Sequence, residues 1–136
     1  MNILFLCTGN SCRSQMAEGL GKKLKGDQYR FFSAGTKKHG LNARAVQVMA
    51  EAGVDISKHL SKTTDEISEK MDIVFTVCGD ANENCPYRAG EKIVHIGFDD
   101  PPRLTAKLVD EKEVLAVYRR VRDEIKEFIL QIEKYV

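Results

Sequence analysis

A cysteine and an arginine near the start of the chain are spaced so that together they could attack an oxyanion. Cys7 ends an apolar run, and Arg13 and Ser14 follow it after five intervening residues. A thiolate is the nucleophilic form of cysteine, and arginine binds tetrahedral oxyanions through two parallel hydrogen bonds. Gly9 and Asn10 tolerate left-handed backbone angles, so the loop can turn N–H groups toward an anion at a helix N-terminus. The segment predicts a nucleophilic thiol in an anion-binding loop.

The same segment has a simpler interpretation, in which a glycine turn leads to a helix capped by Ser14 and Cys7 merely packs in the core. The passage from strand to loop to helix makes that interpretation weaker. The segment contains no G-x-x-x-x-G-K-[ST] pattern, so a nucleotide-binding loop is also disfavoured.

A second pair of cysteines, Cys78 and Cys85, follows another apolar run. A zinc site is disfavoured because C-x6-C is wide for a zinc knuckle and no second Cys/His pair nearby completes four ligands. On a helix the two Cα atoms would lie roughly 10 Å apart, whereas a disulfide needs about 7 Å or less. The intervening Gly, Asp and Asn residues are weak helix formers. The pair therefore predicts a redox switch with two conformations.

The elements that must position these residues alternate between strand and helix. Apolar runs typical of buried strands stand at 3–7, 29–33, 72–78 and 92–97. Helical patterns stand at 15–25, capped by Ser14; at 43–52, capped by Asn42; from Thr63 to near Met71; and at 110–135. Residues 99–102 contain two prolines and are expected to form a loop.

This alternation predicts a single three-layer α/β domain over residues 1–136, with a four-stranded parallel sheet flanked by helices. Ligands of such sheets bind beyond the carboxyl ends of the strands. Cys7 and Cys78 each end a predicted strand, so both are expected to face one crevice.

Composition excludes several classes of protein. Of the 136 residues, 43% are hydrophobic and 30% are charged, which is ordinary for a globular chain and not for a disordered one. The net charge of +1 offers no basic field for nucleic acid or for an anionic membrane. No apolar run approaches the roughly 20 residues of a membrane span, and the first residues lack a signal-peptide pattern. We expect a cytoplasmic protein, in which a structural disulfide framework is disfavoured.

With these features in place, the segment C-T-G-N-S-C-R-S-Q-M-A-E-G at residues 7–19 resembles the active-site segment of thioredoxin-coupled arsenate reductases. These belong to the low-molecular-weight protein tyrosine phosphatase superfamily, whose members share C-x5-R-S and a late Asp-Pro acid loop. Ser33-Ala34-Gly35 with His39-Gly40, Asp99-Asp100-Pro101, and the segment 120–125 extend the resemblance along nearly the whole chain. C-G-D-A-x-x-x-C-P at Cys78–Pro86 resembles the redox segment of the reductases, which the phosphatases do not need.

The resemblance implies a relay of three cysteines. Cys7 attacks arsenate, Cys78 then attacks Cys7 and releases arsenite, and Cys85 attacks Cys78, leaving a disulfide that thioredoxin reduces. The family's general acid precedes the proline, which favours Asp100 over Asp99, although Asp-Pro is also a common turn. No cofactor is expected to be bound, and the chain is expected to be a monomer. The residues implied to bind the oxyanion are Thr8, Gly9, Asn10, Ser11, Cys12, Arg13 and Ser14.

Some family members bind potassium beside this loop, and the matching residues here are Asn10, Glu18, Ser33 and Lys62. Lys62 stands where the family has a carboxylate, and an ammonium group makes a poor neighbour for a cation. Lys62 is either a solvated surface lysine or the group that supplies the positive charge itself.

Two other functions remain open at this point. A low-molecular-weight phosphatase that hydrolyses phosphate monoesters through a phosphocysteine would use Cys7, Arg13 and Asp100, but would leave Cys78 and Cys85 without a role. A redox sensor without enzymatic activity would use the second cysteine pair, but would not need Asp100.

Overall fold

The structure is a computed structural model that describes residues 1–77 and 92–136. Four parallel strands form one sheet in the order β2-β1-β3-β4. The strands are β1 (Asn2–Cys7), β2 (Arg30–Gly35), β3 (Ile73–Thr76) and β4 (Lys92–His95). The predicted parallel α/β sheet is therefore confirmed. The predicted end of the third strand at Cys78 lies outside the described residues, as does the whole segment between Cys78 and Cys85.

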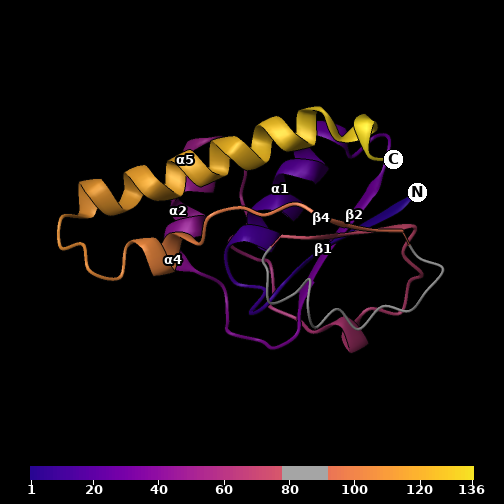
Figure 1. Cartoon of the computed structure of the whole chain (residues 1–136), viewed down its shortest axis with the longest axis horizontal. Coiled ribbons are helices and arrows are strands. Elements are labelled where there is room, and N and C mark those ends of the chain that lie inside the picture. Colours follow the sequence, from indigo (N-terminus) through magenta and orange to yellow (C-terminus); the bar gives the residue numbers. More distant parts are fainter. Residues whose placement is uncertain (78–91) are drawn as a thin grey trace.

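The central strand β1 is apolar along its length because both of its faces are covered. Ile3 to Leu6 are fully buried, as expected for a strand inside a parallel sheet. Helices α1 (Arg13–Lys25) and α5 (Glu111–Leu130) lie on one side of the sheet, with α2 (Ala43–Glu51) beside them, and the short 3-10 helix η1 (Thr64–Glu66) lies on the other (Figure 1). Among the described residues, the layer opposite α1 and α5 thus carries a 3-10 turn and no α-helix.

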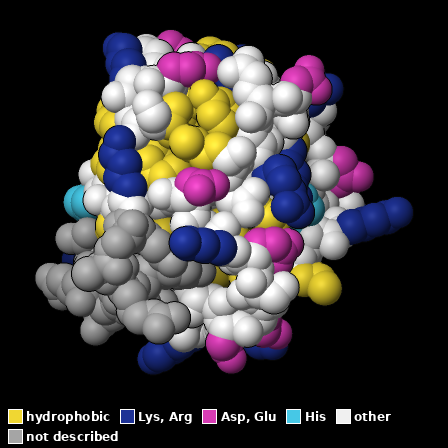
Figure 2. Space-filling view, turned by 90° about the vertical axis from the view of Figure 1, so that its right-hand side faces the viewer, with side chains coloured by type: hydrophobic (Ala, Val, Ile, Leu, Met, Phe, Trp, Pro, Cys, Tyr) yellow, Lys and Arg dark blue, Asp and Glu magenta, His cyan; other side chains and the backbone are white. Residues whose placement is uncertain are grey.

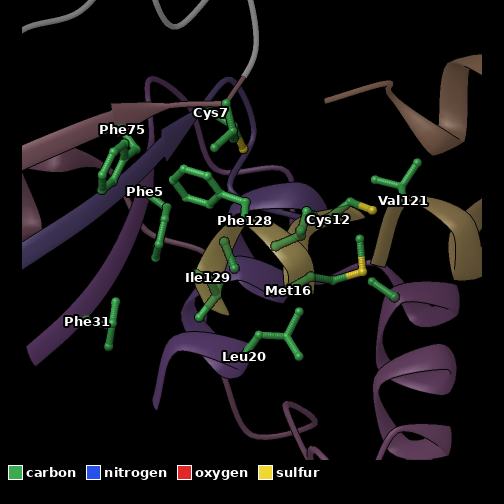
Figure 3. Close-up of a cluster of buried hydrophobic side chains, with 14 of the residues drawn as sticks. Phe5, Cys7, Cys12, Met16, Leu20, Phe31, Phe75, Val121, Phe128 and Ile129 are labelled. Atoms are coloured by element: carbon green, nitrogen blue, oxygen red, sulfur yellow. The ribbon is translucent and has the colours of Figure 1, made fainter. Parts of the chain in front are cut away.

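Aromatic rings fill the space between the sheet and α5. Phe128 of α5 meets Phe75 edge to face at a centroid distance of 5.1 Å and Phe5 at 6.5 Å, and Phe5 in turn stacks on Phe31 at 5.9 Å (Figure 3). Such offset and perpendicular pairs are favoured by the ring quadrupoles. This cluster fixes α5 against β3 and against β1, the strand whose end carries Cys7.

The helix signals in the sequence are correct in part. Asn42 caps α2, its side chain accepting from the N–H groups of Arg44 and Ala45, and Gly53 follows that helix with a φ of +80°. Thr63 and Glu66 form the expected capping box, but the helix that it starts is only one 3-10 turn.

Three local predictions are wrong. Ser14 does not cap α1, because the helix begins at Arg13 and the serine side chain turns toward Cys7. Pro101 and Pro102 do not lie in a loop but begin α4 (Pro101–Leu104), since proline needs no N–H partner in a first helical turn. On α2 the apolar pattern of Ala43, Val46, Met49 and Ala50 predicts one buried face, but the buried residues are Ala45, Val48 and Met49, and Ala43 and Ala50 are exposed.

The helix predicted at 110–135 is largely confirmed by α5 (Glu111–Leu130). Buried side chains recur along α5 at helical spacing, and a second 3-10 helix, η2 (Ile132–Lys134), follows it.

On the face shown in Figure 2, a hydrophobic patch lies among lysine, arginine and acidic side chains. In the part of the chain that the structure describes, no helix has the length and apolar character needed to cross a membrane.

Gly21 lets α1 approach β2 closely, and an alanine there is expected to destabilise the protein. A Cβ atom at this position would lie 2.7 Å from the ring of Phe31, which is itself fixed by Phe5. Overpacking of this kind costs about 1–3 kcal/mol, more than the helix propensity of alanine offsets. Urea denaturation of Gly21→Ala should show a lower free energy of unfolding than that of the unaltered protein. Lys23→Ala, at an exposed position of the same helix, should leave the free energy of unfolding unchanged. An unchanged or raised midpoint in Gly21→Ala would contradict the close packing.

Candidate active site

A cavity of about 290 Å³ opens where β1 ends, at the carboxyl edge of the sheet. Its walls come from the loop after β1, the start of α1, the loop after β2 and the start of α4. The lining residues are Cys7, Thr8, Gly9, Ser11, Cys12, Arg13, His39, Asp100 and Pro102. The structure thus brings together Cys7, Arg13 and Asp100, which the sequence separates by up to 93 positions.

Asn10 and Ser14, two residues implied to bind the oxyanion, do not line this cavity but lie fully buried behind it. The Sγ atom of Cys7 is 2.9 Å from the Oγ atom of Ser14, whose oxygen accepts from Nδ2 of Asn10 at 2.9 Å. Because the serine oxygen already accepts from Asn10, its own proton can point to the sulfur. The Ser14 hydroxyl can therefore donate a hydrogen bond to the Cys7 sulfur.

Asn10 holds the loop in its turned shape. Its φ of 49° lies in the left-handed region, which asparagine tolerates better than most residues. Its Nδ2 also donates to Ser33 at 3.0 Å, and its Oδ1 accepts from the N–H of Lys62 at 2.8 Å and from Gln15 at 2.9 Å. Both hydrogens and both lone pairs of the amide are therefore used.

Gln15 and His59 support Asn10 from behind, and sequence analysis missed both. Gln15 is fully buried, and its Nε2 also donates to the Leu60 carbonyl at 3.0 Å. Burial lowers the pKa of His59, although the charge of Glu18 acts in the opposite direction. The neutral ring then donates from Nδ1 to Oε1 of Gln15 across 3.1 Å. Helical periodicity could not reveal Gln15, because a buried glutamine looks polar in the pattern; its place directly after Ser14 was the available signal.

Two glycines beside the loop, Gly9 and Gly35, have no room for a side chain. A Cβ atom on Gly9 would lie 2.3 Å from Nδ1 of His39, and one on Gly35 would lie within 3 Å of the backbone of Thr8, Asn10 and Lys37. The His39 side chain therefore lies directly against Gly9 and lines the cavity.

Arg13 reaches from α1 to the segment after β4. Its Nη1 donates to the carbonyl of Phe98 at 2.9 Å, and its Nη2 lies 3.7 Å from Oδ2 of Asp100. Asp100 precedes α4 but makes no side-chain cap hydrogen bond, so its carboxyl group remains available to the cavity. Asp99 instead pairs with Arg120 of α5 at 3.1 Å. The two neighbouring acids thus lie in different surroundings, and only Asp100 lines the cavity.

Cys12 also lines the cavity, but the surroundings of its thiol do not suit a nucleophile. The residue is 4% exposed, and burial raises its pKa far above the ordinary value for cysteine, although the charge of Arg13 opposes the shift. A thiol in such surroundings stays protonated at neutral pH and packs beside Met16 and α5 (Figure 3).

The four residues that match the family's potassium site lie together behind the loop. Oε1 of Glu18 accepts from Ser33 at 2.6 Å and lies 3.5 Å from Nζ of Lys62, while Oε2 accepts from Lys22 at 2.7 Å. Burial of Glu18 disfavours its charge, but hydrogen bonds from Lys22 and Ser33 and the charge of Lys62 lower its pKa overall. Glu18 is thus an ionised carboxylate with two ammonium partners. In residues 1–77 and 92–136, no group of three or more His, Cys, Asp or Glu side chains is arranged to hold a metal ion.

Comparison with known proteins agrees with this geometry. The family model described as low molecular weight phosphotyrosine protein phosphatase matches residues 2–136. The chain belongs to this family. The resemblance inferred from C-x5-R-S and the Asp-Pro segment is therefore confirmed.

Within the family, the chain is similar to arsenate reductases. The arsenate reductase of Halalkalibacterium halodurans is 55% identical over 125 residues, which cover 90% of this chain and 88% of that protein. The solved structure of an arsenate reductase in the phosphate binding state has a TM-score of 0.75 at 28% identity and covers 96% of this chain and 95% of its own. The low molecular weight protein tyrosine phosphatase from T. tengcongensis has a TM-score of 0.78 at 27% identity, with coverages of 100% and 99%.

Removal of the Gln15 side chain is expected to destabilise this family member through its loop. In Gln15→Ala, the Leu60 carbonyl and the His59 ring each lose a hydrogen-bond partner. The side-chain oxygen of Asn10 loses one of the two N–H groups that donate to it. Buried polar groups left in this state lower the free energy of unfolding by about 2–3 kcal/mol. Urea denaturation measures the change, with Gln47→Ala on the exposed side of α2 as the control. Equal stability of the two variants would argue against a supporting role for Gln15.

Proposed function

We propose that this chain reduces arsenate to arsenite, with Cys7 as the nucleophile. The observation that carries the proposal is the 55% identity to a protein named arsenate reductase. It is supported by a small cavity that Cys7, residues of the loop after β1, Arg13 and Asp100 line together. That volume suits a tetrahedral oxyanion, because charged and polar groups surround it and, among the described residues, no Phe, Tyr or Trp ring lines it.

In the first step, the Cys7 thiolate attacks arsenic while Arg13 and the N–H groups of residues 8–13 hold the oxygens. A sulfur–arsenic bond forms, and one arsenate oxygen leaves as water after Asp100 gives it a proton. Asp100 suits this role because it lines the cavity and no cap hydrogen bond occupies it. The Ser14 hydroxyl, 2.9 Å from the sulfur, stabilises the thiolate before attack.

The second step uses the cysteines that lie outside the described residues. Cys78 attacks the sulfur of Cys7, a disulfide forms, and the electron pair of the sulfur–arsenic bond passes to arsenic. Arsenic(V) is thereby reduced to arsenic(III), and two thiols are oxidised. Cys85 then attacks Cys78 and frees Cys7, and thioredoxin reduces the resulting Cys78–Cys85 disulfide in the cytoplasm. The electrons come from thiols, so the proposed cycle uses no bound cofactor, and a monomer suffices for it.

A second candidate, hydrolysis of phosphate monoesters through a phosphocysteine, is favoured by the family to which the chain belongs and by the likeness to a tyrosine phosphatase. Cys7, Arg13 and Asp100 would act as in the first step of arsenate reduction. Weak phosphatase activity is compatible with arsenate reduction because the two reactions begin with the same attack on a tetrahedral oxyanion.

Variants of two cysteines, Cys7 and Cys85, separate these activities. NADPH oxidation coupled through thioredoxin reductase and thioredoxin measures arsenate reduction, and p-nitrophenyl phosphate measures hydrolysis. Cys7→Ser should abolish both, by about a thousandfold or more, because it removes the shared nucleophile. Cys85→Ser should abolish arsenate turnover and leave hydrolysis within about twofold, since it acts after the shared step. Hydrolysis without arsenate-dependent NADPH oxidation in the unaltered protein would instead make it a phosphatase.

We further propose that Lys62 supplies the positive charge that a potassium ion supplies elsewhere in the family. Its ammonium lies 3.5 Å from Glu18, so a cation placed there would be repelled. The unaltered protein should therefore reduce arsenate equally fast in potassium and sodium salts of equal ionic strength. Lys62→Asp should become stimulated by potassium, while Lys70→Asp, a change at an exposed lysine, should not. Specific stimulation of the unaltered protein by potassium would refute the proposal.

A further inference from the structure

The carbonyl groups of the loop after β1 are bound from outside by residues 36–42, which we name the outer segment. Its backbone N–H groups donate to the carbonyl oxygens of Cys7 at 3.2 Å, Thr8 at 2.9 Å, Gly9 at 3.0 Å and Ser11 at 2.9 Å. The donors, in the same order, are Thr36, Lys37, His39 and Asn42. The outer segment therefore decides in which direction these carbonyl groups point.

The direction of each carbonyl group fixes the direction of the next N–H group. A trans peptide unit is planar, so its C=O and N–H bonds point to opposite sides, and the described residues contain no cis peptide bond. The Thr8 carbonyl faces Lys37 and Thr36, which do not line the cavity of Cys7. The N–H group of Gly9, in the same peptide unit, thus points away from the outer segment. Thr8 and Gly9 both line the cavity.

Thr36 binds this part of the loop through both its backbone and its side chain. Its N–H group donates to the Cys7 carbonyl, and its hydroxyl donates to the Thr8 carbonyl at 3.2 Å. The second donor to the Thr8 oxygen is the N–H group of Lys37. Because a carbonyl oxygen has two lone pairs, these two donors hold it from two directions.

A donor on a carbonyl oxygen also changes the N–H group of the same peptide unit. Hydrogen bonds in a chain polarise one another, so a bond to C=O strengthens the N–H group as a donor. The Thr36 hydroxyl therefore makes the Gly9 N–H group a stronger donor to an anion. It does so from behind the loop and adds no net charge to the cavity.

We propose that Thr36 is a positioning residue of the loop after β1, whose hydroxyl aims and polarises the Thr8–Gly9 peptide unit toward a bound oxyanion. Thr36 acts through the Thr8 carbonyl and does not touch the substrate. The proposal rests on the proposed function in one respect, namely that this loop binds a tetrahedral oxyanion. It does not depend on the relay of three cysteines.

The test is an NMR titration with inorganic phosphate, a tetrahedral oxyanion like arsenate, that follows the amide resonances of residues 8–13. Two pairs of proteins differ by the hydroxyl alone: the unaltered protein with Thr36→Val, and Thr36→Ser with Thr36→Ala. In each pair, loss of the hydroxyl should raise the Kd for phosphate by about fivefold. The two proteins that keep the hydroxyl should agree within about twofold.

The amide of Gly9 gives a second measurement that needs no ligand. Its proton and nitrogen resonances should move upfield in Thr36→Val, because the peptide unit is then less polarised. The matched control is Thr64→Val, the same substitution at a threonine of η1 outside the cavity, which should change neither the Kd nor the Gly9 resonances. Unchanged amide resonances in the rest of the described sheet would show that the variants are folded.

Three outcomes would overturn the proposal. They are the absence of phosphate-induced shifts at residues 8–13 in the unaltered protein, an unchanged Kd in both variants that lack the hydroxyl, and equal weakening by Thr64→Val. A lower free energy of unfolding in Thr36→Val with an unchanged Kd would also overturn it, since the hydroxyl would then serve stability alone. Phosphate binding that follows the hydroxyl, in a protein that does not reduce arsenate, would support this proposal and contradict the proposed function.

Discussion

The left-handed backbone at Asn10 lets the loop after β1 turn back over the end of the strand, and the side chain of the same residue holds that turn in place. Its amide joins Ser14 of α1, Ser33 of β2 and the backbone of Lys62, three segments that are far apart in the sequence. A buried amide with every donor and acceptor engaged is costly to displace. The shape of the loop that is proposed to bind the oxyanion thus rests on one residue, Asn10, that does not itself line the cavity.

The parallel sheet decides which residues can share that cavity. All four strands point their carboxyl ends the same way, so the loops after β1, β2 and β4 meet at one edge. Cys7 ends the inner strand β1, His39 follows the neighbouring β2, and Asp100 follows the edge strand β4. Cys7, the proposed nucleophile, therefore lies at the centre of the sheet edge and Asp100, the proposed acid, at its side, with the cavity between them.

The sequence predicts the strands of this molecule and its motif residues better than it predicts the buried polar contacts between them. Strands such as residues 3–7 are evident because burial on both faces leaves an unbroken apolar run, and Cys7, Arg13 and Asp100 are recognisable because a motif carries them. Ser14 was misread as a helix cap, since local preference cannot reveal that a sulfur atom across the loop is its partner. The prolines at 101 and 102 were misread because a rule about helix interiors does not apply to a first turn. Gln15 and His59 escaped notice because their partners come together only through tertiary structure.

The segment that carries Asp100 is attached to helices α1 and α5, and α1 also follows directly on the loop after β1. Arg13 of α1 binds the Phe98 carbonyl, Phe128 of α5 packs edge-on against the Phe98 ring at 6.0 Å, and Arg120 of α5 holds Asp99. Helices α1 and α5 pack against each other along the sheet. The distance between Arg13, the proposed anion-binding group, and Asp100, the proposed proton donor, is therefore set by how one pair of helices packs, and a substitution between α1 and α5 that shifts one helix would change it.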